Sequence, residues 1–228
     1  MYISGLQKLT LLDFPGRLAA TVFLGGCNFR CPFCHNATLV LSPGECEKIS
    51  EDEFFSFLSS RKGKLSGVCI TGGEPTLYGG LKDFIIRIKE EGFAVKLDTN
   101  GTDPDLLSEL ISEGLVDYVA MDIKNSLDKY ALTVGTSVDI EKVKRSVEIL
   151  LSGKVDYEFR TTVVKEFHKK EDFIAISEWI SGAKRYFLQT FEDSGDLIGS
   201  GFSAYSREET EGILSLILPS IPNAQIRS

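Results

Sequence analysis

The sequence predicts an α/β fold in which six strand–helix units form one open, partial barrel. Three observations lead to this prediction. β-rich runs alternate with amphipathic stretches, no low-complexity linker divides the 228 residues, and charged residues share one face of several strands. Such alternation is typical of a parallel sheet with right-handed crossovers. We therefore expect residues 1–228 to form a single domain.

The predicted strands are the β-rich runs at 20–25, 67–71, 94–98, 117–123, 156–163 and 185–191. The predicted helices carry apolar residues at three- and four-residue spacing, at 51–60, 81–91, 105–113, 140–151, 170–180 and 207–218. Ser50 with Glu53, and Ser206 with Glu209, resemble capping boxes at the starts of two helices. Together these elements make six βα units.

Charged residues gather on one face of the middle strands, because side chains alternate between the two faces of a strand. They are Lys96, Asp98, Asp122, Lys124, Glu158 and Arg160. A closed eight-stranded barrel is filled by apolar layers, and an unpaired buried charge costs several kcal/mol. An open barrel that holds a polar ligand fits this face best. The alternative is a polar sheet edge exposed to water.

Composition narrows the class of protein. The 33 acidic and 25 basic residues give a net charge of −8, which disfavours nucleic acid as a partner. No apolar run reaches the roughly 18 residues of a membrane span, and the N-terminus lacks the pattern of a signal peptide. We expect a soluble, cytoplasmic protein with no membrane partner.

Three cysteines, Cys27, Cys31 and Cys34, follow the first predicted strand within eight residues. Thiolates are the usual ligands of iron–sulfur clusters, and a [4Fe–4S] cluster ordinarily takes four of them. Three would leave one iron open to another ligand. The alternatives are a cluster of free thiols, or a zinc site completed by His35, although a ligand adjacent to Cys34 reaches a tetrahedral site poorly. Cys46 and Cys69 receive no role.

A Cys-x3-Cys-x2-Cys loop with an aromatic residue, Phe33, before its last cysteine resembles the radical S-adenosylmethionine (SAM) superfamily. The resemblance implies a partial (β/α)6, TIM-like barrel and a [4Fe–4S] cluster held by Cys27, Cys31 and Cys34. It further implies that SAM binds the fourth iron and is cleaved reductively to methionine and a 5′-deoxyadenosyl radical. The backbone around Phe33 would pack near adenine. No catalytic residue beyond the cluster and SAM is implied.

The turn after the second predicted strand reads GGEP at 72–75. Two glycines let backbone approach a ligand closely, and a carboxylate accepts hydrogen bonds from an ammonium group. By resemblance, Gly72, Gly73 and Glu74 hold the amino group of SAM. The alternative is a turn with no ligand.

Two further motifs, DTNG at 98–101 and MDIK at 121–124, resemble segments of glycyl-radical enzyme activating enzymes. The resemblance implies that Lys124 contacts the SAM carboxylate and that Asp122 lies near the sulfonium or ribose. It also makes Asp98 a SAM-binding residue. The alternatives are internal ion pairs, Asp98 with Lys96 and Asp122 with Lys124.

The fifth predicted strand resembles the segment of these activases that contacts ribose and adenine, which makes Arg160 and Thr162 candidates for SAM binding. Some activases carry a SAM-contacting histidine at the end of the sixth strand, where this chain has Gln189. His168 is expected at the surface.

LDFPG at 12–16, CHN at 34–36, GGEP and MDIK together resemble anaerobic ribonucleoside-triphosphate reductase activating proteins. The resemblance implies a glycyl radical formed on a partner, that reductase, with electrons from a flavodoxin or ferredoxin that Arg30 could help to receive. The alternatives are a pyruvate formate-lyase activating enzyme, a 7-carboxy-7-deazaguanine synthase-like enzyme and a non-catalytic iron–sulfur electron carrier.

Overall fold

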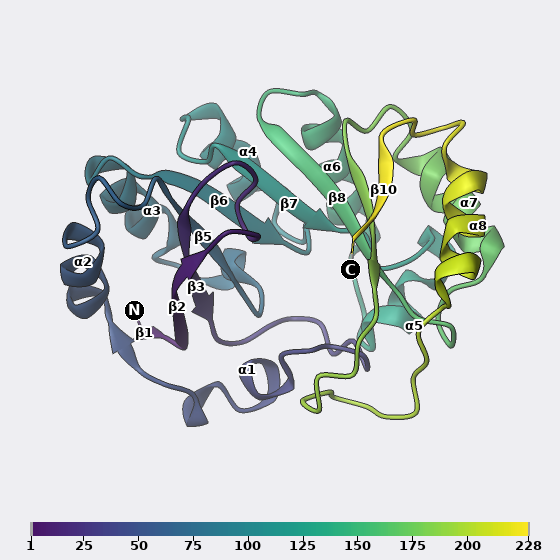
Figure 1. Ribbon diagram of the computed structural model, residues 1–228, viewed down its shortest axis with the longest axis horizontal. Helices are drawn as coiled ribbons and strands as arrows, with labels where there is room; N and C mark the ends of the chain where they lie inside the picture. The colour runs from purple at the N-terminus through teal and green to yellow at the C-terminus, as the bar shows by residue number, and fades with distance from the viewer. Residues whose placement is uncertain (1, 228) are drawn as a thin grey trace.

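The computed structural model describes residues 2–227, and Figure 1 shows its ribbon. These residues form one eight-stranded sheet in the order β10-β9-β8-β7-β6-β5-β3-β2, and a small sheet of β1 and β4. The strands are β1 (Tyr2–Ile3), β2 (Gly5–Thr10), β3 (Ala19–Leu24), β4 (Ile49–Ser50), β5 (Gly67–Gly72), β6 (Ala94–Thr99), β7 (Tyr118–Asp122), β8 (Asp156–Val163), β9 (Tyr186–Thr190) and β10 (Ala224–Arg227).

Helices connect the successive parallel strands of the main sheet, and the longer helices lie along the outer side of the curved sheet (Figure 1). The α-helices are α1 (Ala37–Leu41), α2 (Glu51–Ser59), α3 (Leu81–Glu90), α4 (Pro104–Ser112), α5 (Tyr130–Val134), α6 (Ile140–Leu151), α7 (Lys170–Trp179) and α8 (Arg207–Ile217). Short 3-10 turns are η1 (Pro43–Glu45), η2 (Pro75–Leu77) and η3 (Leu127–Lys129). Both predicted capping boxes are present, at Ser50 and at Ser206.

The predicted fold class is confirmed, because β3, β5, β6, β7, β8 and β9 pair in parallel and alternate with helices. The prediction of six strands was incomplete at both edges of the sheet. β2 adds an antiparallel edge strand beside β3, and β10 adds a parallel strand beside β9. Within residues 2–227 these two edge strands do not pair with each other, so the barrel stays open.

The two faces of the sheet differ in chemistry. Helix residues such as Phe84 and Ile85 on α3 are buried and pack in the main apolar core with residues of the strands. A second, small apolar cluster of Phe14, Ala19 and Tyr118 lies where β3 and β7 begin. Buried polar residues occupy the inner face beyond this cluster, toward the carboxyl ends of the strands. None of the helices within residues 2–227 is both long and apolar enough to cross a membrane.

Candidate functional site

A cavity of about 350 Å³ lies at the carboxyl ends of the parallel strands, where active sites of βα barrels are found. All the residues that the sequence assigned to a cluster or to SAM line this one cavity. They are Cys27, Cys31, Phe33, Cys34, Gly72, Gly73, Glu74, Asp98, Asp122, Lys124, Arg160 and Thr162. His35, Asn36, Asn100 and Gln189 line it as well.

The cysteine loop after β3 is held by backbone contacts on two sides. Gly26 N–H donates to the Leu39 carbonyl at 2.8 Å, and Arg30 N–H donates to the Val134 carbonyl at 2.8 Å. The Arg30 guanidinium turns back onto the loop, where Nη1 donates to the carbonyl of Cys27 at 2.5 Å. The Arg30 side chain therefore helps to fix the conformation of the loop. Its role in receiving an electron donor stays a prediction.

Burial favours the neutral thiol at Cys27 and Cys31. Burial raises the pKa of Cys31 to about 11 and also raises that of Cys27, while the Lys124 ammonium acts in the opposite direction on both. Lys124 therefore lies close enough to favour negative charge on these sulfurs. Metal binding would remove the thiol protons, since thiolate is the ligating form.

The donor set fits an iron–sulfur cluster better than a single ion. Within residues 2–227, no three His, Cys, Asp or Glu side chains are arranged to hold one metal ion. The His35 Nε2 atom is buried without a hydrogen-bond partner among the described residues. Three soft sulfur donors around a cavity suit a larger cluster with one open iron.

The aromatic residue of the loop packs into a ring cluster. The Phe33 side chain is buried, and its centroid lies 5.2 Å from that of Phe167 and 6.3 Å from the His168 ring. These contacts fix the backbone between Cys31 and Cys34 against the segment that follows β8.

Gly72, the last residue of β5, and Gly73 approach the backbone of a neighbouring segment closely. A Cβ on Gly72 would lie 2.3 Å from the Leu24 carbonyl oxygen, and one on Gly73 would lie 1.8 Å from the Gly26 oxygen. Gly73 N–H donates to the Leu24 carbonyl at 2.8 Å. Close approach to backbone of β3 and the cysteine loop requires glycine here, whether or not a ligand is bound.

Glu74 is buried, and its carboxylate is held by donors from three residues. Oε1 accepts from Thr76 Oγ1 at 2.6 Å and from Thr99 Oγ1 at 2.8 Å, and Oε2 accepts from Asn100 N–H at 2.6 Å. Burial raises the pKa of Glu74, while these donors oppose the shift. The carboxylate thus organises the turn, as the ligand-free alternative predicted. Oε2 takes only one of these bonds and retains capacity for a further donor.

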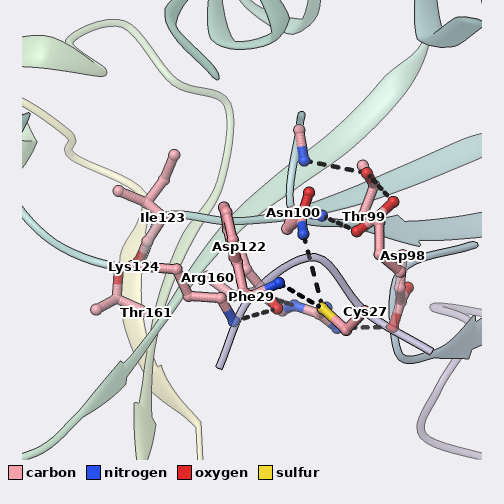
Figure 2. Close-up of polar contacts among 12 residues, drawn as sticks. Cys27, Phe29, Asp98, Thr99, Asn100, Asp122, Ile123, Lys124, Arg160 and Thr161 are labelled. Atoms are coloured by element: carbon pink, nitrogen blue, oxygen red, sulfur yellow. Dashed lines mark hydrogen bonds and ion pairs between the residues drawn. The ribbon is translucent and has the colours of Figure 1, made fainter. Parts of the chain in front are cut away.

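A row of side chains with alternating charge crosses the inner face of β6, β7 and β8 and ends at Lys124, just after β7. Figure 2 shows most of this row. Lys96 pairs with Asp98, whose Oδ2 accepts from Arg160 Nη1 at 3.1 Å. Arg160 Nε donates to Asp122 Oδ1 at 2.9 Å, and Lys124 Nζ donates to Asp122 Oδ2 at 2.9 Å. Both internal ion pairs that the sequence left open are therefore present. The alternative of an edge exposed to water was wrong, because Lys96 is only 2% exposed.

The charges of this row are stabilised by one another. Burial alone would raise the pKa of Asp122, but Arg160 and Lys124 hold it at about 2. Burial by itself would lower the pKa of Lys124, because it disfavours the charged ammonium. The attraction of the Asp122 carboxylate is stronger than this effect, so the pKa of Lys124 is raised. The cavity therefore presents a permanent cation beside the cysteine loop.

Glu158 does not take part in this row of charges. It pairs with Arg227, a residue for which the sequence analysis predicted no role. Its carboxylate accepts from Arg227 on β10 at 2.7 and 3.0 Å, and from Tyr118 Oη at 2.8 Å.

On the neighbouring strands β8 and β9, Thr162 and Gln189 are paired in register and both line the cavity. Gln189 thus lies in the wall of the cavity beside Thr162.

His168 is buried, so the prediction of a surface position was wrong. Its Nε2 lies 2.8 Å from the Lys124 carbonyl oxygen and its Nδ1 lies 3.2 Å from the Val164 nitrogen. With a proton on Nε2, the ring donates to Lys124 and accepts from Val164. The chain therefore uses this imidazole to fix the backbone that carries Lys124.

Comparison with known proteins agrees with this geometry. A curated relative from Methanocaldococcus jannaschii, provisionally named as a glycyl-radical enzyme activating enzyme, is 37% identical over 201 residues, 83% of this chain and 80% of that protein. A 7-carboxy-7-deazaguanine synthase of Methanopyrus kandleri is 33% identical over 49% of this chain, and a pyruvate formate-lyase-activating enzyme of Clostridium pasteurianum is 31% identical over 54%. The chain spans about half the length of each of the latter two, 51% and 52%.

Solved structures support the fold. Streptococcus suis SuiB bound to S-adenosylmethionine matches with a TM-score of 0.69 and 14% identity, over 91% of this chain and 52% of that one. A domain of a pyruvate-formate lyase-activating enzyme from Bacteroides vulgatus matches with a TM-score of 0.59 and 16% identity, over 72% and 99%. The family profile described as the Radical SAM superfamily matches residues 21–180. The chain therefore belongs to the radical SAM superfamily, whose enzymes use a [4Fe–4S] cluster and SAM.

Proposed function

We propose that this enzyme is an activase that generates a glycyl radical on a partner enzyme, and that the partner is an anaerobic ribonucleoside-triphosphate reductase. One observation carries the chemistry. Three cysteine thiols, a permanently charged lysine and a glycine-rich turn converge on a single cavity. The relative from M. jannaschii supports the activase class, and the sequence motifs at 12–16 and 121–124 favour the reductase.

Cys27, Cys31 and Cys34 would hold the cluster, with one iron left open toward the cavity. When bound, the cluster supplies one electron for the cleavage of SAM. The chain contributes a loop that is tied to the turn after β5 by the Glu74 N–H, which donates to the Gly26 carbonyl at 2.9 Å, and to the end of α5 by the Arg30 N–H, so the thiols keep their spacing. Residues 1–228 would act as one domain in this role.

SAM carries an ammonium, a carboxylate and a sulfonium, and the cavity offers partners for them. The Lys124 ammonium would bind the carboxylate, and the turn of Gly72, Gly73 and Glu74 would bind the ammonium. The ion pairs support this arrangement, because Lys124 and Arg160 both pair with the single carboxylate of Asp122. One carboxylate does not neutralise two cations, so Lys124 can also pair with the carboxylate of SAM.

The remaining predicted contacts concern the sugar and the base. Asp122, Arg160 and Thr162 would face the ribose, and the backbone at Phe33 would face adenine. Asp98 lines the cavity as well, and its carboxylate pairs with Lys96 and Arg160. We propose that Asp98 also belongs to the SAM site, where it would support Arg160.

A protein substrate needs access to the cavity. The unpaired edges β2 and β10 leave the barrel open within residues 2–227. A flexible loop of the partner could bring its glycine Cα beside the 5′ carbon of SAM, since hydrogen transfer requires near contact. Reducing equivalents would come from a flavodoxin or ferredoxin.

Pyruvate formate-lyase is the second candidate partner, because an activating enzyme of that lyase is among the relatives. The test mixes the reconstituted, reduced protein and SAM separately with the reductase and with the lyase. Electron paramagnetic resonance then records the glycyl-radical signal. We expect the signal with the reductase. A signal with the lyase alone would overturn the partner. 5′-Deoxyadenosine formation without either signal would favour a small-molecule enzyme such as the deazaguanine synthase.

A further inference from the structure

Asn100, which received no role from the sequence, joins the two halves of the cavity. It follows β6 and is only 5% exposed. Its backbone N–H donates to Glu74 Oε2 at 2.6 Å, so it is attached to the turn after β5. Its side-chain Nδ2 lies 2.8 Å from Asn28 Oδ1. The same nitrogen lies 4.0 Å from Cys27 Sγ, a contact that Figure 2 shows.

The side-chain amide is oriented by its neighbours. Asn100 Oδ1 accepts from Thr102 Oγ1 at 2.7 Å and from Thr102 N–H at 3.1 Å. Asn28 Nδ2 in turn donates to Thr102 Oγ1 at 2.9 Å. These bonds fix which end of the Asn100 amide is oxygen, and they direct the nitrogen toward Asn28 and Cys27.

Cys27 Sγ therefore has two N–H groups beside it, Asn100 Nδ2 and the Phe29 backbone nitrogen at 3.3 Å. In the thiol form, Cys27 itself lies 3.9 Å from Asn28 Oδ1 as a donor. A metal-bound thiolate loses that proton and becomes a stronger acceptor, which favours the contact from Asn100.

We propose that Asn100 sets the reduction potential of the cluster, through a hydrogen bond from its side-chain amide to the sulfur of Cys27. This inference rests on the proposed cluster site. Hydrogen bonds to cluster sulfurs stabilise the more negative, reduced state and so raise its potential. Reduction adds one electron from an external reductant and neither makes nor breaks a covalent bond at Asn100.

The position of Asn100 also connects the reduction potential of the cluster to the turn that is proposed to bind SAM. The same residue binds Glu74 through its backbone and Cys27 through its side chain. A shift of the turn on ligand binding would change the distance from Nδ2 to Sγ. Asn100 is thus a positioning residue that acts through Cys27.

The test compares the full-length protein with Asn100→Leu and Asn100→Asp, each reconstituted anaerobically with iron and sulfide. Leucine removes the donor without adding charge, and aspartate keeps the acceptor that Thr102 needs. Thr102→Ser is the matched control, because it changes the neighbour of Asn100 but keeps the hydroxyl and the N–H that orient the Asn100 amide. The midpoint potential of the cluster is measured without SAM, by titration with dithionite under electron paramagnetic resonance.

We expect more negative midpoint potentials in both Asn100 variants and the wild-type value in Thr102→Ser. An unchanged potential in Asn100→Leu with a full cluster would overturn the inference. If neither Asn100 variant assembles a cluster, wild type labelled with 15N at the asparagine side chains decides the question. A hyperfine coupling that persists in both Asn28→Asp and Asn36→Asp supports the contact, and no coupling in wild type overturns it. Wild type that binds no iron would instead refute the proposed function.

Discussion

Removal of the Lys124 charge tests the proposed SAM site most simply, because the surroundings of this side chain can tolerate its loss. In Lys124→Met, Asp122 keeps its ion pair with Arg160 at 2.9 Å. The backbone stays anchored as well, since His168 contacts the Lys124 carbonyl and not its ammonium. The variant should therefore fold and assemble its cluster while lacking the cation proposed to bind the SAM carboxylate.

The expected effect is a loss of affinity for SAM. A hydrogen bond to a charged group contributes about 1.5–3 kcal/mol, and each 1.4 kcal/mol is tenfold in affinity. The dissociation constant of SAM should thus rise roughly tenfold to a hundredfold, as measured by anaerobic equilibrium dialysis on cluster-loaded protein. Lys144→Met is the matched control, because Lys144 pairs with Glu141 on the outer helix α6. Unchanged SAM affinity in Lys124→Met would show that the lysine serves only as the partner of Asp122.

Three further predictions follow from the same geometry. Gly73→Ala should abolish stable cluster assembly, because its Cβ would lie 1.8 Å from the Gly26 oxygen, whereas Gly79→Ala meets no atom within 4 Å and should keep full iron and sulfide content. The ion pairs of Asp122 hold its pKa at about 2, below the value near 3.9 of an unfolded chain. They therefore stabilise the fold fully above pH ~4, and this stabilisation is lost as the pH falls toward 2. The difference in unfolding free energy between wild type and Asp122→Asn should therefore shrink between pH ~6 and pH ~2 in urea titrations, and a constant difference would contradict the ion-pair account. Alanine at Cys27, Cys31 or Cys34 should each abolish the cluster, while Cys46→Ala and Cys69→Ala should retain it, and a full cluster in Cys31→Ala would exclude the proposed ligand set.

Features encoded by local patterns could be predicted from the sequence. The cysteine spacing and the GGEP turn are each contained in one short segment, and the charges on the inner face come as pairs within three such segments. Parallel strands bring the ends of such segments to one rim, so residues predicted separately line one cavity. The capping boxes at Ser50 and Ser206 are local in the same sense and were predicted correctly.

Features that depend on contacts between distant segments could not be predicted. β10 has four residues and little pattern of its own, yet its Arg227 neutralises the buried Glu158. His168 lies in a polar stretch of sequence, and only the tertiary fold places its ring between Val164 and the Lys124 carbonyl. The glycines of the turn were correctly singled out, but the backbone that they approach belongs to β3 and its loop.

The central claim is that three cysteines of this cavity hold a cluster whose fourth iron binds SAM. Electron–nuclear double resonance on the reduced, reconstituted protein with SAM labelled by 15N at its amino group measures that contact directly. We predict a strong coupling of the amino nitrogen to the cluster spin in wild type. A protein that binds its full complement of iron and sulfide but shows no such coupling would contradict the account.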